Sequence, residues 1–278
     1  MSGTTVSGLF SGMVTRLRGA MGTADRRPPE VPEGVRLYAI GDIHGRDDLL
    51  ADLLARIEDD ARGREPGRNI LVYLGDYVDR GLTSKQVLDR LVSGPPPGFE
   101  AVYLKGNHEA AMLEFLSDAN FGRTWKYYGG LETLHSYGIN ELTQSDNPDD
   151  FARARDHLEK VLPASHRRFL ENLVLSAEFG DYFFAHAGVC PGIELSRQVE
   201  DDLLWIRDAF LNSDQWFGKV VVHGHTPREK PVFRANRIGI DTGAYMTNVL
   251  TCLALEADGR RVIQNADLVL PATTAANG

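Results

Sequence analysis

Short apolar runs alternate with mixed polar and apolar segments from about residue 35 onward. The apolar run at 36–40 predicts a buried strand, and the segment at 47–60 predicts a helix. Further strands are predicted at 69–74, 100–104, 181–185, 219–222, 237–240, 249–256 and 261–263, and further helices at 83–92 and 108–116. This alternation predicts an α/β layered fold with an antiparallel portion late in the chain.

Other segments depart from this pattern. Residues 1–34 combine a weakly amphipathic stretch with a turn-rich one, which predicts a flexible leader or docking helix followed by a linker. Residues 120–175 are predicted to be mainly helical and irregular, without a strand, and residues 266–278 to be a frayed tail. Thr83 and Gln86 predict a capping box at the start of the helix at 83–92.

Composition narrows the class of protein. The 278 residues are 42% hydrophobic and 25% charged, as in a globular domain, so wholesale disorder is not expected. Thirty basic against 39 acidic residues give a net charge of −9, which argues against a general nucleic-acid binder.

Two cysteines, Cys190 and Cys252, exclude a disulfide scaffold and favour a reducing compartment, so a cytoplasmic location is expected. No apolar run predicts a transmembrane segment, and no secretory signal is evident.

Five glycine-punctuated polar loops follow predicted strands, and this is where α/β sheets place ligand sites. A single aspartate or histidine in such a loop is usually a turn or cap residue. Five together are not explained as independent turns. The loops are Gly41–Arg46, Gly75–Gly81, Gly106–Glu109, His186–Gly188 and His223–Pro227.

The side chains in these loops share one chemistry. Aspartate oxygens, imidazole nitrogens and an asparagine carbonyl form a mixed set that suits Mn²⁺, Fe²⁺ or Zn²⁺. The set contains no thiolate, so a structural cysteine–zinc site is not predicted. The candidates outnumber the ligands of one ion, and two ions about 3.5–4 Å apart, bridged by one carboxylate, would accommodate them.

In this order the loops resemble the signatures GDxHG, GDxVDRG and GNHE of the calcineurin-like metallophosphoesterases, and more narrowly of their phosphoprotein phosphatase branch. Lys105 departs from the arginine of the eukaryotic members. The resemblance implies a layered β-sandwich flanked by helices. It also implies a catalytic domain at 35–267, between the leader at 1–34 and a tail at 268–278.

The resemblance also implies metal ligands. Asp42 and His44 would hold the first ion and Asp76 would bridge both, while the second ion would be completed by Asn107, His186 and His225. Mn²⁺ is the expected metal, with Fe²⁺ or Zn²⁺ as alternatives. Pro227 stands where the wider superfamily has a further histidine, which leaves the first ion three protein ligands. His223 is expected to lie behind the ligands and not on a metal.

The implied reaction is direct hydrolysis of a phosphoester, in which a metal-activated hydroxide attacks phosphorus in line with the leaving oxygen. His108, oriented by Asp79, would be the general acid. Arg80, Arg207 and Asn107 would hold the phosphate oxygens. Asp241 is expected to support the site without a direct role.

The resemblance favours a serine/threonine protein phosphatase similar to the phage lambda enzyme. The alternative is a dinucleoside tetraphosphate hydrolase or another phosphatase of small phosphoesters, and a SAPNY-like segment typical of eukaryotic protein phosphatases is absent. The expected partner is thus a phosphorylated protein or small phosphoester, with no nucleic acid. A nuclease and a non-catalytic scaffold are less favoured, and the oligomeric state is not predicted.

The insertion at 120–175 leaves two alternatives open. Its aromatic residues would form either a substrate-recognition wall or a packed structural cap. Its histidines match no motif and are predicted to be surface or helix-end residues. The aromatic residues are Trp125, Tyr127, Tyr128 and Tyr137, and the histidines are His135, His157 and His166.

Overall fold

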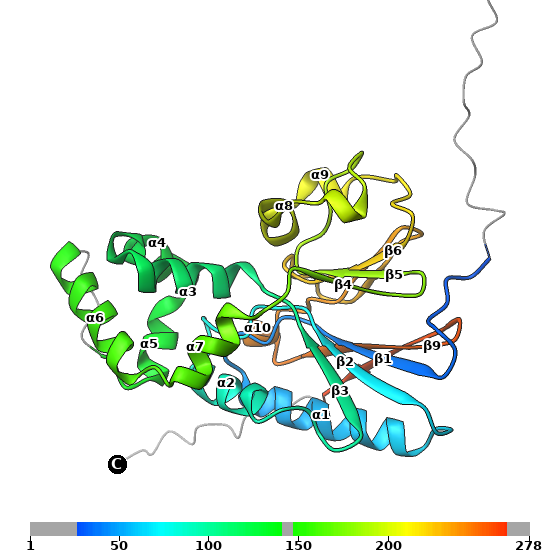
Figure 1. The fold of residues 1–278 in the computed structure, drawn as a ribbon, viewed down its shortest axis with the longest axis horizontal. Helices are drawn as coiled ribbons and strands as arrows, with labels where there is room; N and C mark the ends of the chain where they lie inside the picture. The colour runs from blue at the N-terminus through cyan, green and yellow to red at the C-terminus, as the bar shows by residue number, and fades with distance from the viewer. Residues whose placement is uncertain (1–26, 141–146, 266–278) are drawn as a thin grey trace, which may run out of the picture.

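The computed structural model describes residues 27–140 and 147–265. Within them, two five-stranded sheets pack face to face and helices flank the pair (Figure 1). The predicted layered α/β sandwich is therefore confirmed. Most of the predicted leader and the predicted tail fall outside the described residues. No helix in the described ranges is long and apolar enough to cross a membrane.

The first sheet has the strand order β10-β9-β1-β2-β3. β1 pairs in parallel with β2, and β2 with β3, whereas β9 joins β1 and β10 in antiparallel. The predicted late antiparallel portion is thus the β9–β10 hairpin on one side of this sheet. The strands are β1 (Val35–Ile40), β2 (Arg68–Tyr73), β3 (Phe99–Tyr103), β9 (Thr251–Glu256) and β10 (Gly259–Gln264).

The second sheet has the order β4-β5-β6-β8-β7. Its three central strands are parallel, and both edge strands pair in antiparallel. Both edge strands were missed by the sequence prediction because β4 is only partly buried and β7 has two residues. The strands are β4 (Ser176–Phe179), β5 (Tyr182–Ala185), β6 (Val220–His223), β7 (Val232–Phe233) and β8 (Arg237–Gly239).

The core follows from the alternation of side chains along each strand. In β1, Leu37 and Ala39 belong to the cluster between the sheets, together with Phe184 of β5. Tyr38 and Ile40 point the other way and pack with the helices. Both faces of β1 are therefore buried, which explains why its sequence is an unbroken apolar run.

The helices cover the outer faces of the sandwich and form a lobe at one end (Figure 1). α1 (Asp47–Arg62) lies on the first sheet, and α8 (Glu200–Trp205) and α9 (Asp208–Leu211) lie on the second. The helical prediction for 120–175 is confirmed in its described part, which forms the lobe. The remaining helices are α2 (Ser84–Val92), α3 (Asn107–Ser117), η2 (Ala119–Phe121), α4 (Gly122–Tyr128), α5 (Gly130–Ser136), α6 (Pro148–Val161), α7 (Ala164–Glu171), η3 (Leu195–Arg197) and α10 (Ala244–Thr247).

The predicted capping box of Thr83 and Gln86 is wrong. The Thr83 side chain makes no cap hydrogen bond to α2. Its hydroxyl instead donates to the carbonyl of Gly45 at 2.6 Å and accepts from the amide of Asp47, the first residue of α1, at 3.0 Å. Thr83 therefore satisfies the start of a different helix and ties the loop after β2 to the loop after β1.

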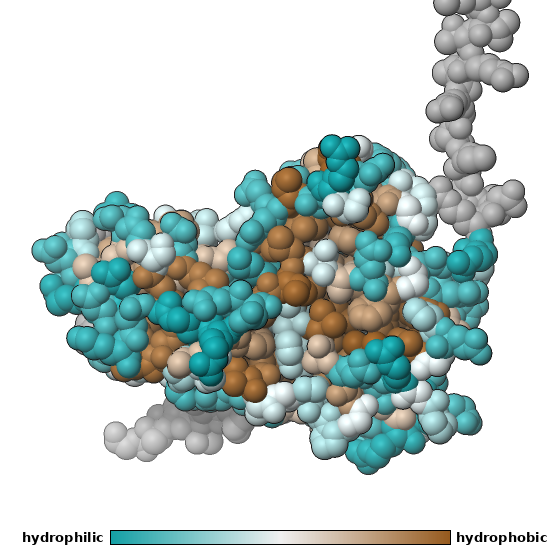
Figure 2. Space-filling view, in the orientation of Figure 1, coloured by the Kyte–Doolittle hydropathy of each residue, from teal (hydrophilic) through white to brown (hydrophobic). Residues whose placement is uncertain are grey.

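One face of the molecule carries a hollow lined with apolar side chains. It has a volume of about 360 Å³ and lies along β3 and the end of α7, where Val102, Phe169, Leu173 and Val174 line it. Figure 2 shows brown side chains gathered over this part of the face. None of the predicted site residues lines this hollow.

Candidate metal centre and active site

The two sheets bring their strand ends together at one edge of the sandwich. Asp42 and His44 follow β1, and the loop from Asp76 to Arg80 follows β2. After β3 the chain reaches Asn107 and His108 at the start of α3, and in the second sheet His186 follows β5 and His225 follows β6. All these side chains except that of Arg80 are buried, so the predicted residues form one enclosed polar cluster.

Four predicted ligands converge beside β5 and β6. The Asn107 Oδ1 atom lies 2.8 Å from both His186 Nε2 and His225 Nδ1. His186 Nε2 is also 3.2 Å from His225 Nδ1 and 3.4 Å from Asp76 Oδ1. One ion could therefore contact an oxygen or nitrogen of each of the four residues.

The other oxygen of Asp76 faces a second group. Asp76 Oδ2 is 3.5 Å from His44 Nε2 and 3.8 Å from His108 Nε2. Asp42 accepts a hydrogen bond from the His225 amide through Oδ2, while its buried Oδ1 has no hydrogen-bond partner among the described residues. Asp76 thus stands between the two groups, in the position expected of a bridging carboxylate.

The protonation of two histidines shows that the cluster suits cations. His44 Nδ1 is 3.0 Å from the carbonyl of Val78, and His186 Nδ1 is 2.8 Å from that of Leu74. A carbonyl only accepts, so each Nδ1 carries the proton and each Nε2 turns a lone pair toward Asp76. Burial lowers the pKa of His186 and lowers that of His44 to about 3, so both rings stay neutral. Lone pairs and carboxylate oxygens packed this closely are a donor set that could hold divalent cations.

His108 forms a dyad with Asp79. Its Nδ1 lies 2.8 Å from Asp79 Oδ2, and both side chains are buried. Burial lowers the pKa of His108, but the charges of Asp76 and Asp79 outweigh it, so the net shift is upward. His108 is therefore suited to carry a proton at Nε2, as a general acid must.

Asp79 is held by residues that the sequence prediction did not assign to the site. Its Oδ2 accepts a hydrogen bond from Trp125 Nε1 at 3.0 Å, and its Oδ1 accepts one from the Thr133 hydroxyl at 2.7 Å. The Asp79 amide also donates to Thr133 and Ser84. The helical insertion therefore supplies part of the support for the dyad.

Arg80 reaches into the site from the same loop. Its Nη2 lies 3.3 Å from His108 Nε2, and its Nη1 donates to the Tyr245 hydroxyl at 2.8 Å. The two nitrogens are close enough that a single acceptor, such as a phosphate oxygen, could receive hydrogen bonds from Arg80 and from a protonated His108. Arg207 is exposed just before α9. Burial is the largest cause that lowers the pKa of His186 and His225, and the charge of Arg207 lowers it further.

Glu109 is a positioning residue that the sequence analysis did not single out. Its buried carboxylate accepts hydrogen bonds from the amides of Asp76, Tyr77, Val78 and Gly106 at 2.7–3.2 Å. Burial and the Asp76 charge raise its pKa to about 7. The sequence feature that could have identified Glu109 is its place in the first turn of α3, where a glutamate can accept hydrogen bonds from the preceding loop.

His223 and Asp241 lie beside the cluster. His223 belongs to neither group of candidate ligands in the described ranges. Asp241 accepts a hydrogen bond from the Gly243 amide, and burial raises its pKa to about 6. The indirect roles predicted for both residues stay predictions.

The aromatic residues of the insertion do not all fit one of the two alternatives, a substrate-recognition wall or a packed structural cap. Trp125 is buried under Phe115 and contacts the dyad, whereas Tyr127 is 89% exposed. Of the predicted surface or helix-end position, only the helix-end part holds for His166: it lies in the first turn of α7 but is buried, and it bonds to the Tyr137 hydroxyl at 2.7 Å and to Asp89 at 3.0 Å. His135 and His157, in α5 and α6, are half-buried.

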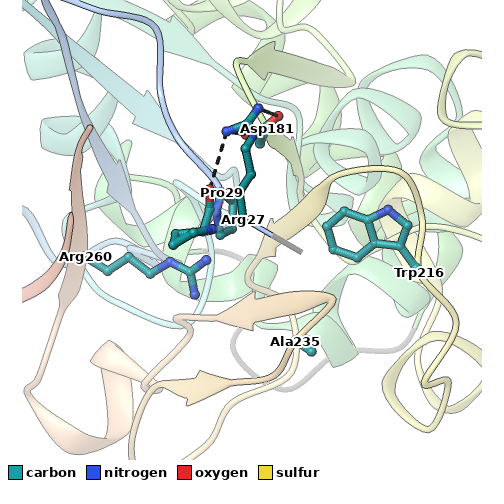
Figure 3. A pocket seen from close by; sticks show the side chains of 7 residues that line it. Arg27, Pro29, Asp181, Trp216, Ala235 and Arg260 are labelled. Atoms are coloured by element: carbon teal, nitrogen blue, oxygen red, sulfur yellow. Dashed lines mark hydrogen bonds and ion pairs between the residues drawn. The ribbon is translucent and has the colours of Figure 1, made fainter. Parts of the chain in front are cut away.

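A cavity of about 410 Å³ lies away from this site, where the chain enters β1 (Figure 3). Figure 3 shows Arg27 turned toward Asp181, with Trp216 on the other side of the cavity. Arg27 Nη1 and Asp181 Oδ2 form an ion pair at 2.9 Å. Arg260 also lines it and donates to the Tyr182 hydroxyl. Because both arginines already have partners, the cavity has no polar group that requires a ligand.

Residues 35–248 match the family model of the calcineurin-like phosphoesterases, and the chain belongs to this family. It is similar to the asymmetrical bis(5'-nucleosyl)-tetraphosphatase PrpE of Halalkalibacterium halodurans, with 28% identity over 77% of this chain and 87% of that protein. It is also 30% identical to the symmetrical bis(5'-nucleosyl)-tetraphosphatase of Acidovorax ebreus, over 56% of this chain and 44% of the relative.

Solved structures share the fold. A proposed diadenosine tetraphosphatase superposes with a TM-score of 0.55 at 22% identity, covering 85% of this chain and 96% of that chain. A cold-active protein tyrosine phosphatase superposes with a TM-score of 0.53 at 18% identity, covering 84% and 81%.

Proposed function

We propose that the chain is a hydrolase of dinucleoside tetraphosphates that uses two divalent metal ions. The ligands would be Asp42, His44, Asp76, Asn107, His186 and His225, which converge as described above. The names of the curated relatives support a dinucleotide substrate. The phosphoprotein substrate favoured by the sequence resemblance therefore becomes the second candidate, supported by the Gly75–Gly81 loop, which has the form of the protein phosphatase branch.

The observation that carries the choice of substrate is a pair of aromatic rings, one beside His108 and the other beside His225. Tyr128 and Trp205 lie with ring centroids 5.7 Å apart and come from α4 and α8, on different parts of the fold. The Tyr128 ring is 6.0 Å from His108, and the Trp205 ring is 6.3 Å from His225. Both rings are half-buried, so part of each is open to a ligand. Nucleobases stack on such rings, at about 1–3 kcal/mol per base.

The chain's own residues would perform three tasks. Arg80 and Arg207 would bind phosphate oxygens, and Asn107 would assist from the ligand cluster. His108 would donate the proton at Nε2 to the leaving phosphate oxygen, while Asp79 holds the ring in place. When bound, divalent ions supply Lewis-acid polarisation of the phosphate and a lower pKa for water. Mn²⁺ is the metal proposed, with Fe²⁺ and Zn²⁺ as alternatives.

The deciding experiment compares kcat/KM for diadenosine tetraphosphate with that for a phosphothreonine peptide, using purified chain and Mn²⁺. We expect a large preference for the dinucleotide. We also expect Trp205→Ala and Tyr128→Ala each to raise KM for the dinucleotide by about 5- to 160-fold, as loss of one stacked base predicts. Hydrolysis of p-nitrophenyl phosphate, which has no base, would change little.

Tyr127→Ala is the matched control, because this neighbouring ring is almost fully exposed. A preference for the peptide would overturn the proposed substrate and leave the metal site intact. A dinucleotide preference that survives both aromatic substitutions would overturn the stacking argument alone.

A further inference from the structure

A further polar cavity, separate from the one in Figure 3, lies beside the loop that carries His225. Its volume is about 220 Å³, and it lies between the loop after β6, the β7–β8 hairpin and the end of α9. Three arginines line it, namely Arg228, Arg234 and Arg237, together with His223 and Thr226. None of the predicted metal ligands and neither of the predicted phosphate-binding arginines is among its lining residues, so it is distinct from the catalytic centre.

None of the three guanidinium groups forms an ion pair with a carboxylate of the described residues, although the charge of Asp214 acts on Arg237. Arg228 and Arg234 are exposed, and within the described ranges neither side chain forms an ion pair or hydrogen bond. Arg237 is only 7% exposed, and it donates from Nη2 to the carbonyl of Leu211 at 2.6 Å. Burial lowers the pKa of Arg237, repulsion from Arg234 and Arg228 lowers it further, and the charge of Asp214 opposes this only in part. Three close positive charges in a chain of net charge −9 need a specific explanation.

The cavity also collects buried polar atoms that lack partners. Six buried side-chain nitrogen or oxygen atoms in the described ranges have no hydrogen-bond partner. Three of the six, namely Arg237 Nε, His223 Nε2 and Thr226 Oγ1, belong to residues that line this one cavity. A buried polar group without a partner costs about 1–3 kcal/mol, so such a concentration marks a place where a ligand would supply the missing interactions.

We propose that this cavity binds a phosphate group outside the catalytic centre. Tetrahedral phosphate offers several acceptor oxygens and a charge that offsets more than one arginine, whereas a neutral ligand would leave the repulsion in place. The small volume suits a single phosphate group and not an extended polyanion, which would need a wide basic surface. The inference is independent of the substrate proposed above, because the three arginines that carry it have no role in the proposed reaction.

The test is equilibrium dialysis of the full chain against labelled inorganic phosphate. The variant Arg228→Gln, Arg234→Gln changes two exposed side chains and is expected to fold normally. We expect its affinity for phosphate at this cavity to fall about tenfold or more, as loss of charge-assisted hydrogen bonds predicts. Arg80→Gln, which weakens phosphate binding at the catalytic centre, should keep the cavity phosphate.

The matched control is Arg197→Gln, Lys230→Gln, which removes two exposed charges outside the cavity. The proposal is overturned if the cavity variant binds as much phosphate, as tightly, as this control. It is also overturned if Arg80→Gln abolishes all binding, because the catalytic centre would then be the only site. Competition by AMP shows which kind of phosphate the cavity binds. Displacement of the label by AMP indicates the phosphate group of a nucleotide, and displacement by inorganic phosphate alone indicates the free ion. Either result supports the site.

Discussion

Trp125 Nε1 donates a hydrogen bond of 3.0 Å to Asp79 Oδ2, the same oxygen that lies 2.8 Å from His108 Nδ1. The indole comes from α4 in the helical lobe, whereas Asp79 follows β2 of the first sheet. The lobe therefore contacts the proposed acid dyad directly. For Trp125 this contact goes beyond both alternatives drawn from the sequence, a substrate wall and a packed cap.

Trp125→Phe should keep the buried aromatic packing and remove only this hydrogen bond. We expect kcat for the dinucleotide to fall by about tenfold, since a hydrogen bond to a charged group contributes about 1.5–3 kcal/mol and Thr133 still holds Asp79. The pH above which activity declines should also move. Steady-state kinetics across pH would measure both effects, with Tyr127→Phe as control. An unchanged pH profile and kcat would show that Trp125 only fills space.

His108→Asn should retain the metal ions and lower kcat by about 10²–10⁴-fold, the range typical of general acid catalysis. The loss should be larger for phenyl phosphate than for p-nitrophenyl phosphate, because phenolate depends on protonation to leave and p-nitrophenolate does not. Parallel assays on the two substrates would measure the difference. Equal losses on both would assign His108 a role other than proton donation, and unchanged turnover would remove it from the mechanism.

Asp76→Asn should reduce metal occupancy, because Asp76 alone faces both groups of candidate ligands. The carboxamide has one acceptor oxygen and no charge, so it cannot bridge two cations as a carboxylate does. Elemental analysis of the purified chain would count the ions, with Asp201→Asn as a surface control. Two ions retained per chain would refute the bridging role.

Asp60→Asn should remove a pH-dependent part of the stability. Asp60, near the end of α1, accepts hydrogen bonds from Tyr38 and Arg261 in the first sheet and from Arg64. Burial raises its pKa, but these bonds outweigh it and lower the pKa to about 2. The contribution is therefore present above the unfolded-state pKa of about 4 and is lost as the pH falls through about 2.

We therefore expect Asp60→Asn to lower the free energy of unfolding by about 1–2 kcal/mol at pH 7 and to have little effect near pH 2. Urea unfolding at several pH values would measure this difference. Asp59→Asn, at a side chain that is 69% exposed, is the control. A loss that is the same at both pH values would indicate a packing effect and not a charge effect.

The sequence predicted well what is local. The five loops could be placed after strands because buried strands are apolar runs and glycines mark their ends. The same logic failed for β4 and β7, which are half-buried or very short. The predicted capping box failed because the Thr83 hydroxyl prefers groups about forty residues away in sequence, Gly45 and Asp47.

Long-range pairings were beyond the sequence prediction. Trp125 lies 46 residues from Asp79, and His166 lies 77 residues from Asp89, so no local spacing marks either contact. The cavity lined by arginines was also beyond the sequence prediction. In the sequence, Arg228 and Arg237 look like ordinary charged residues near turns, and only the fold places them in one cavity. Such contacts depend on how the elements pack against one another, and local patterns in a single sequence do not reveal this packing.

The proposed ligands are divided between the two sheets. Four of them, up to Asn107, follow strands of the first sheet, and His186 and His225 follow strands of the second. On a ribosome, the residues of the first sheet that lead to Asn107 emerge well before His225. A chain still in synthesis would therefore hold at most a partial ligand set, and full metal loading would wait until nearly the whole domain has been made. Metal uptake in the cell would then be a late event that reports a completed fold.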